Sequence, residues 1–412
     1  MARFKKTLLA FIVMNTCVLG SVHTVYAGED TKTVGDVVSK PLPQQSQSHI
    51  VSPPLGLSPQ LHVAVAASPY DVFTPKSQTS DAKLDYTVWD TALRESVVKM
   101  GPSLRIRAPR NKRGTIGSRI VRGHKSPYRL EGSRITFSYL PERYVEALSA
   151  YREDLVQIAN EQDLQSFSRK EQLAFWMNLH NVLVVETIAK NYPVKKPSNL
   201  VIGPHGERLH EAKLVTIKSV PLSLRDIREN IVYKNWSSPV VIYGFYRGDI
   251  GGPGIMDFAL TGENVDYVLH LQAFEFITSL RGFNTTRFNR NISELYSEAR
   301  PYYFQNWPAG VETHLRQFAN ESTLRDLDKG TPFRVEEYDQ VIADLWGGTR
   351  IRGSAAVYSR AGANFDRPPI LFERRLKINT LRRRGMLKRS YSVTITDIET
   401  SDESQSKAIS DK

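Results

Sequence analysis

Hydrophobic residues run almost without interruption through residues 173–188, which is the strongest helix pattern in the chain. Ser168 and Glu171 precede this run as a capping box, in which the serine accepts a hydrogen bond from the amide three residues on and the glutamate reaches back to the amide of the cap. A helix that is apolar on nearly every side is buried on nearly every side. We therefore predict a central, buried helix that begins at Ser168 and ends before Pro193.

Shorter patterns predict the remaining elements. Apolar residues at helical spacing predict further helices over residues 85–97, 141–159, 263–280 and 311–327. A second capping box, Ser223 to Asp226, opens a short helix. Apolar runs flanked by turn residues predict a hairpin between 200–202 and 214–217 and a buried strand over 239–246. Because strands and helices mingle without regular alternation, we predict an α+β fold, rich in helix around a small, mostly antiparallel sheet.

The first 27 residues have the three-part order of a secretory signal peptide. Three basic residues lie within the first six, an apolar run begins at Leu8, and Val25 and Ala27 occupy the positions of a cleavage site. The apolar run is well short of the ~20 residues that a membrane-spanning helix needs, and no later stretch is apolar enough to cross a bilayer. We therefore predict an exported protein, periplasmic or extracellular.

Composition divides the rest of the chain into four regions. Residues 28–80 carry seven prolines and many Ser and Gln without a sustained hydrophobic period. Such a segment cannot bury enough apolar surface to offset its ordering entropy, so we predict a disordered linker. We place the main domain at 81–330, a basic extension at 331–396 and a second disordered segment at 397–412.

The net charge of +12 is concentrated in two basic segments. Residues 105–134 form an insertion with ten Arg or Lys and one Glu, and residues 372–389 contain eight basic residues and one Glu. Such segments are either solvated loops or patches for anionic polymers or a membrane surface. Because Gly and Pro interrupt the insertion, we favour a solvated loop there. Nothing in either segment predicts recognition of a specific nucleic acid.

The predicted central helix carries polar residues that need partners. Glu171, Asn178 and Asn181 lie near one face, because steps of seven and three residues bring side chains together, and His180 lies on a neighbouring stripe. A buried amide without a partner costs about 1–3 kcal/mol. These side chains either form a polar site for a substrate or tie down adjacent backbone, and we favour the second interpretation because buried polar groups are usually satisfied internally.

The same helix carries a recognisable motif. Residues 171–181, Tyr192-Pro193 and the Ser-Leu-Arg-Asp-Ile run at 223–227 resemble the domain-of-unknown-function 547 family, whose pattern is an A-F-W-x-N-x-Y-N helix, then Y-P and S-L-x-D-I. The strand and G-x-x-x-x-P loop that follow in the family correspond to 240–253, and the resemblance covers residues 85–325. From this motif we take five candidate site residues: Glu171, Trp176, Asn178, His180 and Asn181.

This chain departs from the family pattern at several positions. His180 stands where the family has Tyr, and Arg228 stands where it has Glu after the S-L-x-D-I segment. A His and cysteines that bacterial relatives carry on the strand and loop are replaced here: Ile242, Arg247 and Gly252. If those groups form a papain-like hydrolytic site, the resemblance implies a remotely papain-like fold. This chain would then lack the nucleophile, because its one cysteine, Cys17, falls in the predicted signal peptide.

Neither of two features that could hold a cofactor has the complete pattern. The loop at 248–254 lacks the Gly-Lys-Ser/Thr ending of a phosphate-binding loop, so we interpret Asp249 as a turn residue. His205 and His210 lack a third ligand at a helpful spacing. We therefore predict no cofactor and no metal site.

Three functions remain open. We favour a non-catalytic protein of the cell envelope that binds an unidentified envelope protein or a cell-wall component. The second is a hydrolase with a degenerate papain-like site, which would use Asn178, His180 and Asn181 with Arg247 or Asp249. The third is a basic binder of anionic polymers or surfaces. An open cleft in which Asn178 and His180 face Arg247 and Asp249 would favour the hydrolase, whereas burial against backbone groups would disfavour it.

Overall fold

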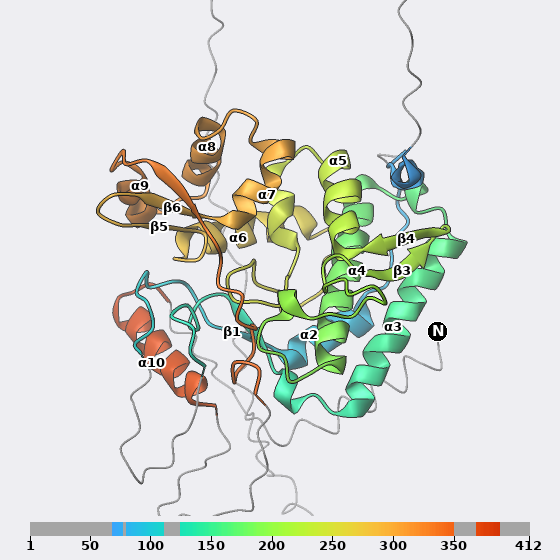
Figure 1. Ribbon diagram of the computed structural model, residues 1–412, viewed down its shortest axis with the longest axis horizontal. Coiled ribbons are helices and arrows are strands. Elements are labelled where there is room, and N and C mark those ends of the chain that lie inside the picture. Colours follow the sequence, from blue (N-terminus) through green and yellow to red (C-terminus); the bar gives the residue numbers. More distant parts are fainter. Residues whose placement is uncertain (1–67, 77–79, 111–123, 350–367, 388–412) are drawn as a thin grey trace, which may run out of the picture.

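A computed structural model describes residues 68–76, 80–110, 124–349 and 368–387. Within these residues, helices surround three small sheets, so the predicted α+β fold is confirmed (Figure 1). The predicted signal peptide, residues 1–27, and the predicted C-terminal tail, residues 397–412, lie outside the described residues. The papain-like part of the expectation stays a prediction.

The predicted helices over 85–97, 141–159, 168–190 and 263–280 are confirmed. The predicted helix over 311–327 is two helices, because Asn320 accepts a hydrogen bond from the amide of Thr323 and starts a new helix. The α-helices are α2 (Thr87–Ser96), α3 (Glu142–Glu161), α4 (Arg169–Lys190), α5 (Tyr233–Asn235), α6 (Val265–Thr278), α7 (Glu294–Tyr303), α8 (Ala309–Gln317), α9 (Glu321–Leu327) and α10 (Pro369–Arg383).

Short helical turns connect the longer helices. The 3-10 turns are η1 (Pro69–Phe73), η2 (Phe137–Tyr139), η3 (Leu164–Ser166), η4 (Pro197–Asn199) and η6 (Pro239–Gly244), and η5 (Asp226–Val232) is π-helical. The predicted capping box that opens the segment at 223 is present, since Ser223 and Asp226 each accept a hydrogen bond from the backbone amide of the other.

The strands form separate small sheets rather than one. They are β1 (Val97–Lys99), β2 (Ser133–Ile135), β3 (Lys213–Ile217), β4 (Val220–Ser223), β5 (Phe283–Thr285), β6 (Arg290–Ser293) and β7 (Phe333–Glu336). Among the described strands, β1–β2, β3–β4 and β5–β6 pair antiparallel and β6–β7 pairs parallel. The prediction of mostly antiparallel pairing is therefore confirmed, but the prediction of a single sheet is wrong.

The predicted hairpin is wrong in its first strand. β3 pairs with β4 across a tight turn at Lys218 and Ser219, both of which have positive φ. A turn with positive φ usually contains Asn or Gly, and neither residue is present here. Residues 200–202 contribute only one bridge, between Val201 and Arg208.

The predicted strand over 239–246 is also wrong. Its apolar residues are buried, but Pro239 opens the 3-10 turn η6, which packs close to α4. A Cβ at Gly244 would lie 2.3 Å from the sulfur of Met177, so a larger residue there would force the Met177 side chain to move. Periodicity cannot separate a buried strand from a buried helical turn in so short an apolar run.

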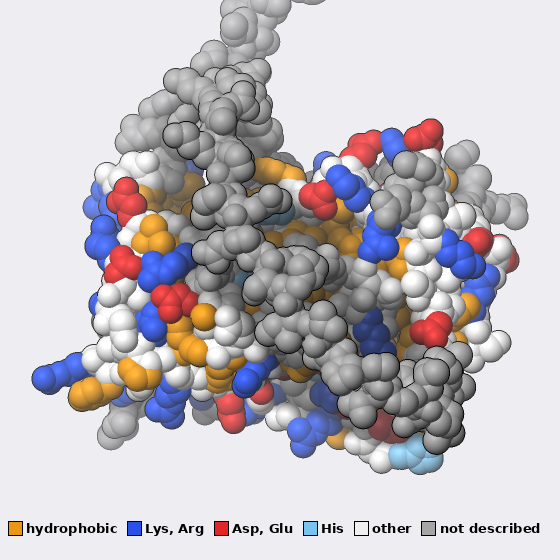
Figure 2. Space-filling view, turned by 90° about the horizontal axis from the view of Figure 1, so that it is seen from above, with side chains coloured by type: hydrophobic (Ala, Val, Ile, Leu, Met, Phe, Trp, Pro, Cys, Tyr) orange, Lys and Arg blue, Asp and Glu red, His pale blue; other side chains and the backbone are white. Residues whose placement is uncertain are grey.

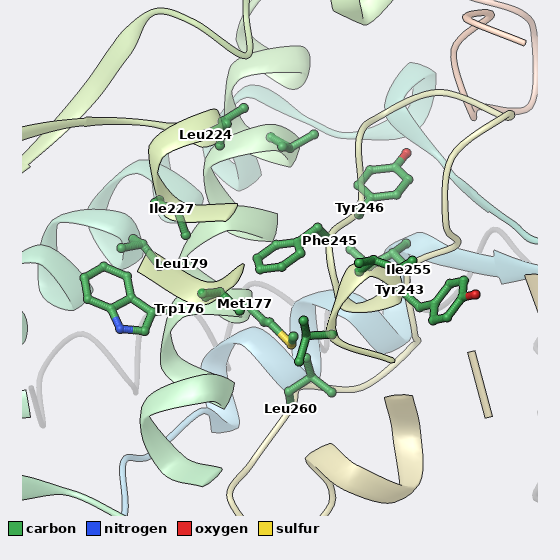
Figure 3. Close-up of a cluster of buried hydrophobic side chains, with 14 of the residues drawn as sticks. Trp176, Met177, Leu179, Leu224, Ile227, Tyr243, Phe245, Tyr246, Ile255 and Leu260 are labelled. Carbon is green, nitrogen blue, oxygen red and sulfur yellow. The ribbon is translucent and has the colours of Figure 1, made fainter. Parts of the chain in front are cut away.

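Helix α4 forms the centre of the core, as the sequence predicts. Every residue from 171 to 186 is buried. Helices α3 and α6 and the turn η5 contact it, and α6 also packs on η6. Figure 3 shows side chains from α4, η5 and η6 meeting in this core, with Met177 extended toward Leu260.

Two predicted flexible regions contain packed residues. The predicted linker, 28–80, is wrong for η1, because the ring of Phe73 lies 5.1 Å from that of Trp176 and the Tyr70 hydroxyl donates to Asp226 over 2.7 Å. The solvated-loop interpretation of 105–134 is wrong for Arg129 and Arg134, which are both buried. Residues 68–76 and 124–134 are therefore part of the folded unit.

Candidate functional site

Glu171, at the start of α4, holds two distant segments together. Ser168 accepts from the Glu171 amide over 3.2 Å, which is half of the predicted capping box. The Glu171 carboxylate does not return to the cap amide; it accepts hydrogen bonds from the amides of Leu84, over 3.0 Å, and Gly262, over 2.9 Å. The side chain is thus a buried tie between loops.

The two asparagines of the motif also tie down backbone. Asn178 donates to the carbonyl of Leu260 over 2.7 Å and accepts from its amide over 3.2 Å. Asn181 donates to the carbonyl of Gly244 over 3.0 Å and accepts from the amide of Tyr246 over 2.9 Å. Each amide side chain therefore satisfies backbone groups that the irregular loops leave without partners.

His180 uses both ring nitrogens. Its Nδ1 lies 3.2 Å from Oδ1 of Asn181, and its Nε2 lies 3.2 Å from Nη1 of Arg228. Because Oδ1 of Asn181 is an acceptor, Nδ1 carries the proton, and Nε2 accepts from the guanidinium. Burial and the Arg228 charge hold the pKa of His180 well below its usual range. The imidazole is therefore neutral, and both of its nitrogens have a hydrogen-bond partner.

Arg228 lies between two buried imidazoles. Its Nη1 lies 3.2 Å from His180 and 3.4 Å from Nδ1 of His210, and burial and the Arg228 charge lower the pKa of His210 as well. The guanidinium is 2% exposed, and among the described residues no carboxylate pairs with it. In the sequence, Arg228 stands out by its departure from the family Glu, whereas His210 suggests only a metal ligand.

Arg247 has the carboxylate partner that Arg228 lacks. Its two terminal nitrogens bond the two oxygens of Glu298, the first over 2.8 Å, and the guanidinium stacks on the ring of Tyr338. Burial opposes ionisation of Glu298, but the Arg247 charge prevails and holds the pKa of that carboxyl below its usual value. Glu298 lies on α7 and Tyr338 follows β7, and no sequence pattern connects either residue to Arg247.

Arg228 with its two histidines and Arg247 with Glu298 are two bonded groups that act on each other, and on Tyr233, electrostatically. We name these six residues the Arg228 cluster: Arg228, Arg247, His180, His210, Tyr233 and Glu298. Burial and the neighbouring Arg247 charge both lower the pKa of Arg228. Two guanidinium groups face one carboxylate in this network, so its interior carries an excess of positive charge. Of the buried polar atoms without a hydrogen-bond partner among the described residues, four belong to this cluster: Nε of Arg228, Nε of Arg247, Nε2 of His210 and the hydroxyl of Tyr233.

Asp249 is a turn residue, as the sequence predicts. Its carboxylate accepts from the amide of Gly252 over 3.0 Å and from the hydroxyl of Ser198 over 3.1 Å. Burial raises the pKa of Asp249 to about 7, although the Arg247 charge opposes this shift.

The open cleft that the hydrolase hypothesis requires is not found at these residues. The exposed fractions are 1% for Asn178, 0% for His180, 2% for Arg247 and 1% for Asp249. Trp176 is buried too, with its ring 5.2 Å from that of Phe175. The α4 side chains Glu171, Asn178 and Asn181 are thus satisfied by the protein itself, whereas several atoms of the Arg228 cluster are not.

Residues 164–277 match the family described as a protein of unknown function, DUF547. The chain contains a DUF547 domain. The matched residues run from η3 into α6, so the DUF547 match includes His180, Arg228 and Arg247 but not Glu298. No curated protein and no solved structure matches the chain.

Metal binding and membrane spanning are two other possibilities for the described residues. Among these residues, no group of three or more His, Cys, Asp or Glu side chains is placed to hold a metal ion. Of the helices that the structure describes, none is both long and apolar enough to span a bilayer.

Proposed function

We propose that this chain is an exported, non-catalytic binding protein of the cell envelope, in which the Arg228 cluster receives an anionic group of the ligand. Export rests on the signal-peptide pattern of residues 1–27. The ligand is an envelope protein or a cell-wall component that carries a carboxylate or a phosphate. Because Arg228 is buried, as Asn178 is, the residues that cover it have to open for this group to enter.

The observation that carries this proposal is the buried Arg228 guanidinium without a carboxylate partner among the described residues. Because Nδ1 of His210 accepts from Arg228, its Nε2 carries a proton, so Nε of Arg228 and Nε2 of His210 are both donors without acceptors. A buried charge of this kind is costly unless an opposite charge compensates it. An anionic oxygen supplies both the missing charge and the missing acceptor.

The same geometry argues against hydrolysis at α4. His180 cannot take a proton from a nucleophile while Nε2 accepts from Arg228, and its lowered pKa makes it a weak base. The Ser198 hydroxyl donates to the Asp249 carboxylate, and among the described residues no histidine bonds to either side chain to relay a proton. Residues 28–412 contain no cysteine.

Thermal unfolding of residues 28–412, which include every described residue, tests the binding site. We expect phosphate or acetate to raise the Tm saturably above the value in chloride of equal ionic strength, because a ligand that binds only the folded state stabilises it. Arg228→Met should lose this response. Arg225→Met, which removes an exposed guanidinium three residues earlier, should keep it. A response that persists in Arg228→Met, or that neither anion produces, overturns the site.

A second measurement tests the non-catalytic part of the proposal. We expect no turnover of chromogenic ester or peptide substrates by residues 28–412. Turnover that is lost in a folded His180→Gln variant and kept in Arg225→Met would instead establish a hydrolase at α4.

A further inference from the structure

Helix α10 presents a basic and apolar face to the outside. Phe372 is 64% exposed and Leu376, four residues later, is 51% exposed. The exposed Arg375, Arg382 and Arg383 lie on the same side of the helix, because they follow Phe372 by three, ten and eleven residues. We name these five residues the α10 surface. The opposite side of the helix buries other residues: Ile370, Lys377 and Leu381.

The orientation of α10 is fixed by ties to the basic insertion and to β1. Arg129 forms a two-pronged ion pair with Glu373, with both bonds at 2.7 Å. The Lys377 ammonium donates to the carbonyls of Gly101 and Leu130, and Arg374 donates to the carbonyl of Lys99. The α10 surface therefore points outward because the other side of the helix is held.

The charge of the α10 surface is not compensated. Among the described residues, Arg375, Arg382 and Arg383 have no ion pair, and the one carboxylate of the helix, Glu373, is neutralised by Arg129. The segment 105–110 lies beside α10 (Figure 1) and adds the exposed Ile106 and further arginines. Over the face seen in Figure 2, by contrast, basic and acidic side chains are mixed.

We propose that the α10 surface binds an anionic lipid membrane. The arginines would contact headgroup phosphates, and Phe372 and Leu376 would enter the boundary between headgroups and acyl chains, as interfacial helices do. Large apolar side chains among the arginines favour a lipid surface over an anionic polymer, because a polymer backbone binds through charge and offers those side chains no apolar phase. This inference does not depend on the Arg228 cluster.

Cosedimentation of residues 28–412 with lipid vesicles tests the proposal. We expect binding to vesicles of phosphatidylglycerol and phosphatidylcholine in equal parts and little binding to phosphatidylcholine alone. Each arginine at an anionic surface adds about fivefold to partitioning, so Arg375→Gln/Arg382→Gln/Arg383→Gln should weaken binding about 100-fold. The matched control, Lys195→Gln/Lys196→Gln/Lys234→Gln, removes three exposed charges elsewhere and should retain binding.

The apolar part has its own pair of variants. Phe372→Ser/Leu376→Ser should weaken vesicle binding at least about tenfold, because each side chain loses its burial in the lipid boundary. Leu271→Ser/Phe274→Ser changes an exposed Leu and Phe on α6 and should leave binding unchanged. If Phe372→Ser/Leu376→Ser binds vesicles as tightly as the parent chain, or heparin binds the parent more tightly than the anionic vesicles do, the surface is a polyanion site and the proposal is overturned.

Discussion

Arg228 and Arg247 lie inside the molecule, whereas Arg375, Arg382 and Arg383 lie on its outside. Inside, each guanidinium has lost its hydration, so its energy depends on which group replaces the water. Outside, water solvates the charge and a neighbouring carboxylate matters little to stability. The same side chain is therefore a determinant of folding in one place and a long-range charge in the other.

The largest effect should come from removing the paired inner guanidinium. Arg247→Met deletes the partner of Glu298 and the stacking on Tyr338, and breaking a buried ion pair costs about 3 kcal/mol of unfolding free energy. Chemical denaturation measures this loss. A loss below about 1 kcal/mol would show that the bonds of Arg247 contribute little to the stability of the fold.

A buried carboxyl without a full counter-charge should give a pH-dependent effect. The folded-state pKa of Asp249, about 7, lies above the ordinary value of 3.8, so the folded protein binds more protons than the unfolded chain between these pH values. Stability from this group is therefore lost as pH rises from about 4 to 7.

Asp249→Asn isolates this contribution, because the buried histidines titrate equally in both chains. The variant should gain on the order of 2 kcal/mol relative to the parent between pH 5 and pH 8. Parallel stability profiles for the two chains would show that Asp249 ionises normally.

Arg228→Met should change the unfolding free energy in the opposite direction to Arg247→Met. It relieves the repulsion with Arg247 and removes a buried charge that has no carboxylate among the described residues, so we expect stability to rise by about 1 kcal/mol. Denaturation in chloride buffer measures it. A loss as large as that of Arg247→Met would mean that the bonds to His180 and His210 outweigh the desolvation of the charge.

The smallest effect should come from the outer arginines. Arg375→Gln/Arg382→Gln/Arg383→Gln should change the unfolding free energy by less than about 0.5 kcal/mol, because exposed charges contribute little. A Tm drop comparable to that of Arg247→Met would indicate that these side chains hold α10 in place.

Local pattern predicted the parts of the fold that depend on local chemistry. The helix from Ser168 could be predicted because its cap and its apolar run lie within one segment. The turn at Lys218 and Ser219 could not, because positive φ usually requires residues that are absent there. The 3-10 turn at 239–244 could not be predicted either, because the close approach of Gly244 to Met177 is a tertiary contact that the hydrophobic period does not reveal.

The candidate site divides in the same way. Asn178 and Asn181 could be assigned to backbone ties from burial alone, and the structure places them so. The Arg228 cluster could not be predicted, because Arg247 lies in the loop after η6 and Glu298 lies 51 residues further along, on α7. Arg228 itself was visible as a departure from the family pattern, but its partners were not.

The ion pair between Arg129 and Glu373 joins residues 244 positions apart in the chain. A contact of such sequence separation forms late, because the loop between its ends must first be ordered. During synthesis, β1, β2 and the basic insertion can complete their contacts with α10 only after α10, the last described helix, has been made. A chain that stops before Pro369 would leave Arg129 buried without its carboxylate, so we expect such a truncation to be a substrate for quality-control proteases rather than a smaller stable domain.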